Sequence, residues 1–327
     1  MKKLFLSLVA MMVATIGYSQ KTTVATLSHD GEISIYYGIS ALREAHEAAE
    51  SGDIISLSGG TFSSVHITKA VTLRGAGIGS TYPTFILGNF DVNVPDTVTA
   101  HLSMEGIRCT GEITMRGTFS NASFLKCQFN SFLVNCSNIK NVLFVDCKIT
   151  NSYYHFGGTE TVQFINCYVA GFGNNYNISS FSASFINCVI MMRGFINCQL
   201  TNCIIYNPTE NSFKLSSLSL AQNCVIIGNS NDGYLDDSTI STGCKIATYA
   251  ETFKDFTGTY TDDQTFELTN DAKTNFLGTD GEQIGMYGGM MPYNTITSYP
   301  QITKLNVPSH TTADGKLNVE IEVNAGQ

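Results

Sequence analysis

The strongest pattern along the chain is a short block of alternating apolar and polar residues that recurs about every twenty positions. Phe124, Phe144, Phe164 and Phe185 each begin such a block, and each stands three residues before a Cys. The four Cys are separated by 20, 20 and 21 residues. Alternation with period two predicts strands, and a fixed period near twenty predicts that each repeat is one coil of a solenoid. The pattern therefore predicts an all-β protein built as a parallel β-helix.

Stacked coils place equivalent positions above one another, so the recurring Cys should form an internal row. Reduced Cys packs as a small apolar side chain, and neighbours in a parallel stack are poorly oriented for a disulfide. We therefore expect most of these thiols to be free. Residues 195–198 repeat the block out of phase, which leaves the register of residues 191–203 open. The predicted row consists of Cys127, Cys147, Cys167, Cys188, Cys203, Cys224 and Cys244.

A second column of polar residues stands directly before the Cys. Asn tolerates the left-handed backbone of a tight bend, and stacked amides can hydrogen-bond from rung to rung. These properties favour a structural role over a row of ligand-binding side chains, which remains the alternative. The column contains Asn166, Asn187, Asn202 and Asn223, with Asp146 at the same position of an earlier coil.

Before the repeats, residues 40–53 have the pattern of a short amphipathic helix. We expect Ser40 to cap its start and Gly52 to end it. Its apolar face should contain Ile39, Leu42, Ala45, His46 and Ala49.

Motifs at both ends of the repeat region carry a family resemblance. The helix, the strand at residues 52–57, the Gly-Thr-Phe turn at 60–62 and the strand at 71–77 resemble the first coil of pectin-lyase-like β-helix proteins. Residues 266–289 resemble the closing segment of secreted bacterial members. The resemblance covers about residues 33–289 and implies a right-handed, single-stranded parallel β-helix whose apolar end is plugged by the helix. It implies no single activity, since the superfamily contains polysaccharide lyases, galacturonan hydrolases, epimerases and non-catalytic binding proteins.

The chain begins with the features of a bacterial signal peptide. Lys2 and Lys3 precede an apolar segment at residues 4–16, and small residues follow before Gln20. We therefore predict a signal peptide at residues 1–19, a β-helix domain at 20–291 and a C-terminal β-hairpin extension at 292–327. The expected location of the mature chain is secreted, periplasmic or at the cell surface, without a membrane span.

Composition and residue spacing argue against nucleic acid as a partner and against a metal site or a cofactor. A formal net charge of −9 argues against nucleic acid, and only 14% of residues are charged. The six His are scattered and no Cys-x-x-Cys pair occurs, so we expect no metal site and no cofactor. Calcium is expected only if the protein is a lyase. The acidic loop at residues 229–237 does not fit the EF-hand spacing and reads as a turn.

Catalytic residues are weakly indicated. Between residues 113 and 209, the central wall where active sites of the superfamily usually lie, the only carboxylates are Asp146 and Glu160. The best catalytic set is Asp146 and Lys148 on one rung, with Lys126 and Tyr168 on the adjacent rungs. The alternative is a solvated strand face with incidental charges.

A cluster of aromatic residues is the feature that most favours ligand binding. It follows the Cys147 block, where we expect a loop, and a matching segment occurs one coil later. Aromatic faces beside Asn and Gly suit stacking on sugar rings, although the same residues could instead cover a loop or a dimer contact. The carbohydrate-binding candidates are Tyr153, Tyr154, His155, Phe156, Phe172 and Tyr176.

Together these features predict an exported β-helix protein that binds extracellular polysaccharide, or is presented to it, without catalysis. One alternative is a lyase or hydrolase of uronate-containing glycans that uses the Asp146/Lys148 face. The other is an adhesin or scaffold whose protein partner binds the C-terminal hairpin at residues 302–323. Because an isolated hairpin is marginal in water, we expect this hairpin to dock on the solenoid.

Overall fold

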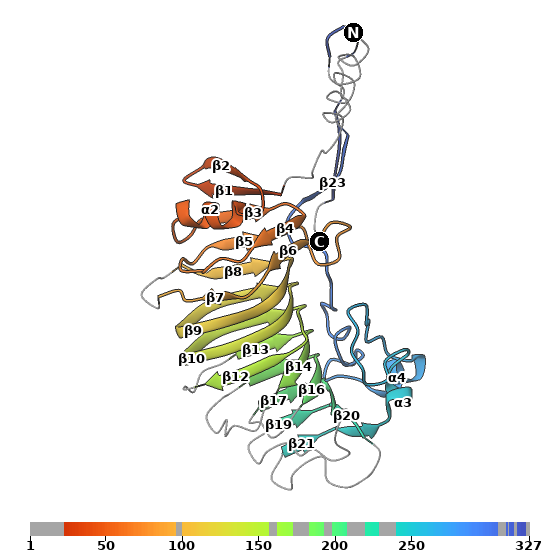
Figure 1. The fold of residues 1–327 in the computed structure, drawn as a ribbon. Helices are drawn as coiled ribbons and strands as arrows, with labels where there is room; N and C mark the ends of the chain where they lie inside the picture. The colour runs from red at the N-terminus through yellow and green to blue at the C-terminus, as the bar shows by residue number, and fades with distance from the viewer. Residues whose placement is uncertain are drawn as a thin grey trace, which may run out of the picture.

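The computed structural model describes residues 23–95, 100–156, 162–172, 183–192, 198–207, 220–228, 240–306, 312, 314–316 and 319–324. Within these ranges the strands stack in parallel from one coil to the next, which confirms the predicted all-β parallel β-solenoid (Figure 1). Antiparallel pairing occurs at the two ends of the chain, in β1 with its neighbours and in a separate C-terminal pair. No helix in the described part of the chain is long and apolar enough to cross a membrane. The predicted signal peptide lies outside the described residues.

Three helices and twenty-four strands have described bounds. The strands before the central coils are β1 (Val24–His29), β2 (Glu32–Tyr37), β3 (Ile54–Leu57), β4 (Gly60–Ser63), β5 (Thr72–Arg74), β6 (Thr84–Leu87), β7 (Phe90–Val92) and β8 (Leu102–Glu105). The central strands are β9 (Ile107–Leu125), β10 (Gln128–Val145), β11 (Lys148–Ile149), β12 (Ser152–Phe156), β13 (Val162–Ile165), β14 (Tyr168–Phe172), β15 (Ala183–Ile186) and β16 (Val189–Met192). The last strands are β17 (Cys198–Thr201), β18 (Ile204–Tyr206), β19 (Leu220–Gln222), β20 (Val225–Ile227), β21 (Ile240–Thr242), β22 (Lys245–Ala247), β23 (Gln301–Asn306) and β24 (Glu320–Asn324). The helices are α2 (Ala41–Ala48), α3 (Tyr249–Thr252) and α4 (Asn270–Asn275).

The core is built from columns of identical or similar side chains. Phe124, Phe144, Phe164 and Phe185 are buried and stack face to face, with ring centroids 4.7–4.8 Å apart. This spacing equals the distance between neighbouring strands in a sheet, so each ring lies directly on the ring of the adjacent coil. The recurring Phe is therefore the inward position of one sheet.

The Cys column lies on the inside of the next corner. None of the nine Cys with described thiols forms a disulfide, and all are buried except Cys244, which is partly exposed. The backbone N–H of Cys147 donates to the Sγ of Cys167, and that of Cys188 donates to the Sγ of Cys203. Successive thiols thus stack from rung to rung.

One coil of the solenoid is shorter than the others. Cys203 stacks on Cys188 although only 15 residues separate them. Cys198 does not belong to this column, since it begins β17 and pairs with Ala183 of β15. The out-of-phase block at residues 195–198 therefore marks a shortened coil.

The polar column before the Cys forms a corner with left-handed backbone. Its φ angles lie between 50° and 56°, and the same conformation occurs at Lys126 one coil earlier. Most L-residues avoid this region, whereas Asn and Asp tolerate it, which confirms the reason given for the Asn column. The residues are Lys126, Asp146, Asn166, Asn187, Asn202 and Asn223.

Helix α2 covers the N-terminal end of the core, and three details differ from what the sequence predicts. The helix ends at Ala48, and Ala49 already has an extended backbone, so Gly52 does not end the helix. The side chain of Ser40 makes no capping hydrogen bond, because it accepts from Arg43 instead. Ile39 precedes the helix and is half exposed, so it is not part of the buried face. Leu42, Ala45 and His46 are buried as expected.

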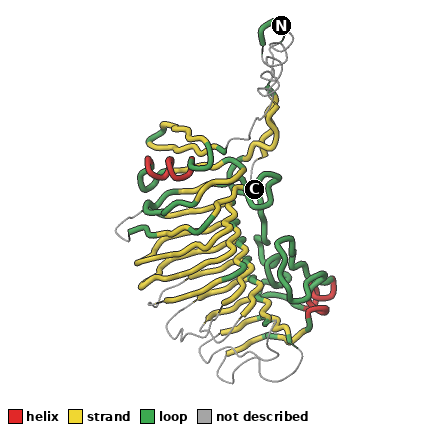
Figure 2. Tube along the Cα trace, in the orientation of Figure 1, coloured by secondary structure: helices red, strands yellow, loops and turns green. Residues whose placement is uncertain are grey.

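The C-terminal part returns along the outside of the solenoid (Figure 2). Residues 249–276, here called the lid, pack Phe253, Phe256 and Phe266 on outward residues of the later coils. Residues 277–299, here called the strap, then run from the late coils to Gly75 and Glu105 of the early coils. The strap therefore joins the two ends of the solenoid.

The expected docking of the C-terminal hairpin is not seen. β23 and β24 pair with each other and with no other described strand. The side chains of Ile321 and Val323 are more than half exposed. Figure 1 shows the hairpin standing off the solenoid at the end that contains β1 and β2.

Candidate functional site

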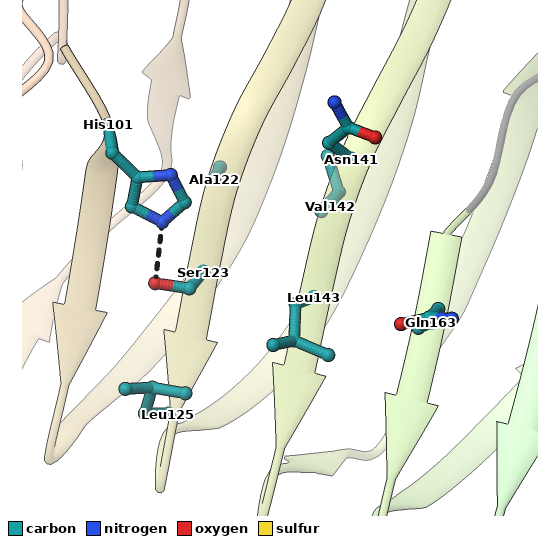
Figure 3. A pocket seen from close by; sticks show the side chains of 8 residues that line it. All are labelled: His101, Ala122, Ser123, Leu125, Asn141, Val142, Leu143 and Gln163. Carbon is teal, nitrogen blue, oxygen red and sulfur yellow. Dashed lines mark hydrogen bonds between the residues drawn. The ribbon is translucent and has the colours of Figure 1, made fainter.

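Two cavities with hydrogen-bonding side chains lie on different outer faces of the solenoid. The first is an open groove of about 540 Å³ on the face formed by β8, β9, β10 and β13 (Figure 3). This volume is in the usual range for ligand sites. It is lined by His101, Ala122, Ser123, Leu125, Asn141, Val142, Leu143 and Gln163.

The floor of the groove follows the register of the strands. Ser123 of β9, Leu143 of β10 and Gln163 of β13 are directly paired, so their side chains stand on successive rungs. Strand alternation makes all three point outward. The groove therefore presents a new side chain about every 4.8 Å along the axis.

Its polar groups are uncharged and partly organised by hydrogen bonds. The Nε2 of His101 lies 2.9 Å from the Oγ of Ser123, which donates to the Oγ of Ser103 at 3.1 Å. Asn141 donates to Asn121 across the neighbouring corner at 3.2 Å. Partial burial lowers the pKa of His101, so its imidazole is neutral at pH 7. No Lys, Arg, Asp or Glu is among the eight lining residues.

The second cavity, here called the charged cleft, has a volume of about 330 Å³. Arg108, Gln128 and Lys148 form its floor, and they occupy one column on three successive rungs. Lid and strap form the opposite wall. That wall contains Asp262, Asp263, Tyr293 and Thr295, and Ile78 completes the lining.

Opposite charges face each other across the cleft. An Nη2 of Arg108 lies 3.8 Å from Asp262, whose other oxygen accepts from the Nε2 of Gln128 at 3.2 Å. The Nζ of Lys148 donates to the carbonyl oxygen of Gln264 at 2.8 Å. Burial lowers the pKa of Lys148, and Arg108 lowers it further, while Asp262 and Asp263 oppose the shift. The cleft thus holds two cations and two carboxylates.

The four catalytic candidates from the sequence do not form one open site. Lys148 lines the charged cleft, and Tyr168 follows it in the same column but is fully buried. The Tyr168 hydroxyl lies 2.9 Å from that of Tyr206, and its ring stacks on Tyr260 of the lid. Asp146 is buried beneath the strap, and Lys126 donates to a strap carbonyl at Ile296.

Of the carbohydrate-binding candidates, the structure describes only part of the backbone. Tyr153, Tyr154, His155 and Phe156 lie in β12, which pairs in parallel with residues 132–136 of β10. This segment is therefore a strand and not the expected loop, because it continues the pairing of the coil before it. Phe172 ends β14. The side chains of these five residues, and the whole of Tyr176, lie outside what is described.

Several cavity residues that were not predicted could have been found from the period of twenty. Counting back by 20 from Lys148 leads to Gln128 and Arg108, and counting back by 20 from Gln163 leads to Leu143 and Ser123. No such signal exists for Asp262 and Asp263, since the lid is not part of the repeat. Among the described residues, no group of three or more His, Cys, Asp or Glu is arranged to hold a metal ion.

Comparisons with known protein families, with curated proteins and with solved structures each gave no match for this chain.

Proposed function

We propose that this protein is an exported β-helix protein of the pectin-lyase-like type that binds neutral extracellular polysaccharide along the groove. The observation that carries the proposal is the composition of the groove. Ser123, Asn141 and Gln163 offer hydrogen bonds to hydroxyl groups, and Leu125 and Leu143 offer apolar surface to the C–H faces of sugar rings. A lining without charged side chains suits a ligand without charge.

The geometry of the solenoid also suits a linear polymer. Successive rungs are separated by the strand spacing, which is close to the length of one pyranose unit in an extended glycan. A chain that lies along the axis therefore meets one new outward side chain, such as Ser123, Leu143 or Gln163, at each sugar. The opening of the groove toward solvent is compatible with a polymer whose ends continue beyond the site.

Binding to soluble neutral and acidic glycans, measured by calorimetry or affinity electrophoresis, tests this proposal. We expect Gln163→Ala and His101→Ala to weaken binding of a neutral glycan about 5–10-fold each, which corresponds to the loss of about one hydrogen bond. Asn275→Ala is the control, because Asn275 is an exposed amide of helix α4 in the lid, outside the lining of the groove. Its affinity should stay unchanged.

Equal affinity for the wild type and both groove variants would contradict the choice of site. If Tyr153→Ala or Tyr154→Ala abolished binding instead, the ligand would bind at β12. The cellular location has its own test, since cell fractionation should find a mature chain that begins at Gln20 outside the cytoplasm.

A second candidate function is favoured by the charged cleft. Asp262 and Asp263 fold back beside Lys148, so carboxylates and bases that lie more than 100 residues apart in the sequence meet in one cavity. Arg108 and Lys148 could hold a uronate carboxylate, as a lyase or hydrolase of uronate-containing glycans requires. Appearance of unsaturated uronate absorbance with an acidic glycan, lost in Lys148→Met, would establish a lyase, and new reducing ends without that absorbance would establish a hydrolase.

A further inference from the structure

The outermost strand at the N-terminal end presents an apolar row to solvent. β2 pairs with β1, and no other described strand pairs with its second edge. Ile33, Ile35 and Tyr37 alternate along it and are 70%, 52% and 64% exposed, whereas Tyr36 packs against the core. An exposed edge strand with large apolar side chains normally promotes pairing with another chain. β2 therefore has the properties of a docking strand.

A second apolar row of the same pitch lies on the C-terminal hairpin. Val319, Ile321 and Val323 also alternate, and they are 46%, 55% and 57% exposed. The hairpin makes no strand pairing with the solenoid. An isolated two-stranded hairpin is marginally stable in water, so this element gains from a partner surface.

Both rows belong to the same end of the molecule. The strap ends at Tyr299, whose hydroxyl donates to the carbonyl of Gly75 and whose ring lies under Arg74. Tyr299 and Pro300 line a cavity of about 370 Å³ together with Val24 and other residues of β1 and β3. The root of the hairpin is thus fixed beside the strand that pairs with β2.

The hairpin begins at Tyr299 and Pro300, and from this point it runs away from β2 of the same molecule. Only Pro300 separates the anchored Tyr299 from β23, and proline restricts the backbone at this point. In Figure 1 the hairpin extends along the solenoid axis beyond β1 and β2. It therefore occupies the space where a second molecule would approach the N-terminal end.

We propose that two copies of this chain form a symmetric dimer in which the hairpin of each copy lies on the β2 edge of the other. The two rows have three apolar residues each at the same alternate spacing, so they match in length and pitch. A two-fold axis repeats the contact, and the reciprocal arrangement closes the assembly at two copies. The second contact doubles the apolar surface that is removed from water. A stable dimer needs more buried surface than one pair of rows provides. The dimer does not depend on glycan binding in the groove.

Sedimentation of the chain that begins at Gln20 tests the proposal. We expect the wild type to sediment as a dimer at micromolar concentration, and Ile35→Glu and Ile321→Lys each to sediment as monomers. Mixing the two variants should restore a dimer, since one contact is then unaltered and the other places a carboxylate beside an ammonium group. This recovery distinguishes a specific interface from a loss of folding.

Ile240→Glu is the control, because Ile240 is an exposed apolar residue of β21 in the last coils and far from the interface. That variant should remain a dimer. A wild type that is monomeric at all concentrations would overturn the proposal, as would variants that remain dimeric. A disulfide in the Ile35→Cys, Ile321→Cys chain that forms within one molecule would show that the hairpin covers its own β2 instead.

Discussion

Asp146 is the one acidic residue in a left-handed corner column whose other described members are Asn, Lys and Gly. It is buried, its Oδ1 has no hydrogen-bond partner among the described residues, and the strap covers it. Burial raises the pKa of Asp146 from 3.8 to about 7, although the nearby Lys126 and the backbone N–H of Asn294 oppose this. At neutral pH the residue is therefore poised between its neutral and charged forms.

This position predicts a stability that falls as pH rises. Between about pH 4 and 7 the folded chain holds a proton on Asp146 that the unfolded chain has lost, so folding is most favourable in acid and weakens through pH 7. Each pKa unit corresponds to about 1.4 kcal/mol, so the loss is on the order of a few kcal/mol. We expect Asp146→Asn to raise the melting temperature at pH 8 and to leave it nearly unchanged at pH 4.5.

Asn suits the site because it already occupies the same left-handed corner in the next coils. Asp255→Asn, which removes an exposed carboxylate from the lid, is the control and should not alter the pH dependence. If Asp146→Asn melts at the same temperature as the wild type at pH 8, the strap does not hold this carboxyl in its neutral form.

At the scale of single elements, the C-terminal end of helix α2 is capped by a residue that lies outside the helix. The Nζ of Lys69 donates to the carbonyl oxygens of His46, Glu47 and Ala49 at 2.7–2.9 Å. These are among the carbonyls that lack a partner within the helix, and a cation there also interacts favourably with the helix dipole. His46 is held neutral by burial, which lowers its pKa to about 4.

Loss of the Lys69 ammonium group should therefore weaken the N-terminal cap. We expect Lys69→Met to destabilise the protein by about 1–2 kcal/mol, because three carbonyls lose a charged donor while the aliphatic part of the side chain is kept. Chemical denaturation measures this change. Lys254→Met removes a Lys whose ion pair is exposed and 3.4 Å long, so it should change stability by less than about 0.5 kcal/mol. Equal effects of the two substitutions would contradict the capping role.

At the scale of the whole molecule, the strap connects coils that the repeat alone links only to their neighbours. Asn166 donates to the carbonyls of Met286 and Gly288 at 2.8 and 3.0 Å, and Asn202 pairs with Thr279. Further along, the backbone and hydroxyl of Ser298 both donate to Glu105. Asn residues at the left-handed corners of the coils therefore also bind the strap.

Removing one of these amides should loosen the strap without unfolding the corner. Asn166→Gly keeps a residue that accepts the left-handed backbone but deletes both hydrogen bonds, and we expect a cost of about 1–3 kcal/mol. Limited proteolysis should then cut within residues 286–299 at a higher rate. The control is Asn121→Gly, at a left-handed corner where the side chain binds Asn141 rather than the strap. Similar cleavage in both variants would show that the strap does not depend on Asn166.

The sequence by itself determined the coils of this protein. The period of twenty identified the coils, the inward Cys column and the left-handed corners, because stacking each coil on the next imposes the same local demand at the same position. It also identified Lys148 as a residue on an outer face. The helix at the N-terminal end was predictable from its apolar spacing, but its cap by Lys69 was not, because that donor lies 20 residues or more from the carbonyls it binds.

Only the tertiary structure decided what surrounds the outer faces. Periodicity predicts that a side chain points outward, but it does not predict whether another segment of the chain covers that side chain. The lid buries Tyr168 and the strap buries Asp146, while Lys148, one rung from Tyr168 in the same column, remains at a cavity beside Asp262. These contacts join residues more than 100 positions apart, and they depend on where a non-repeating segment returns. No local pattern encodes that path.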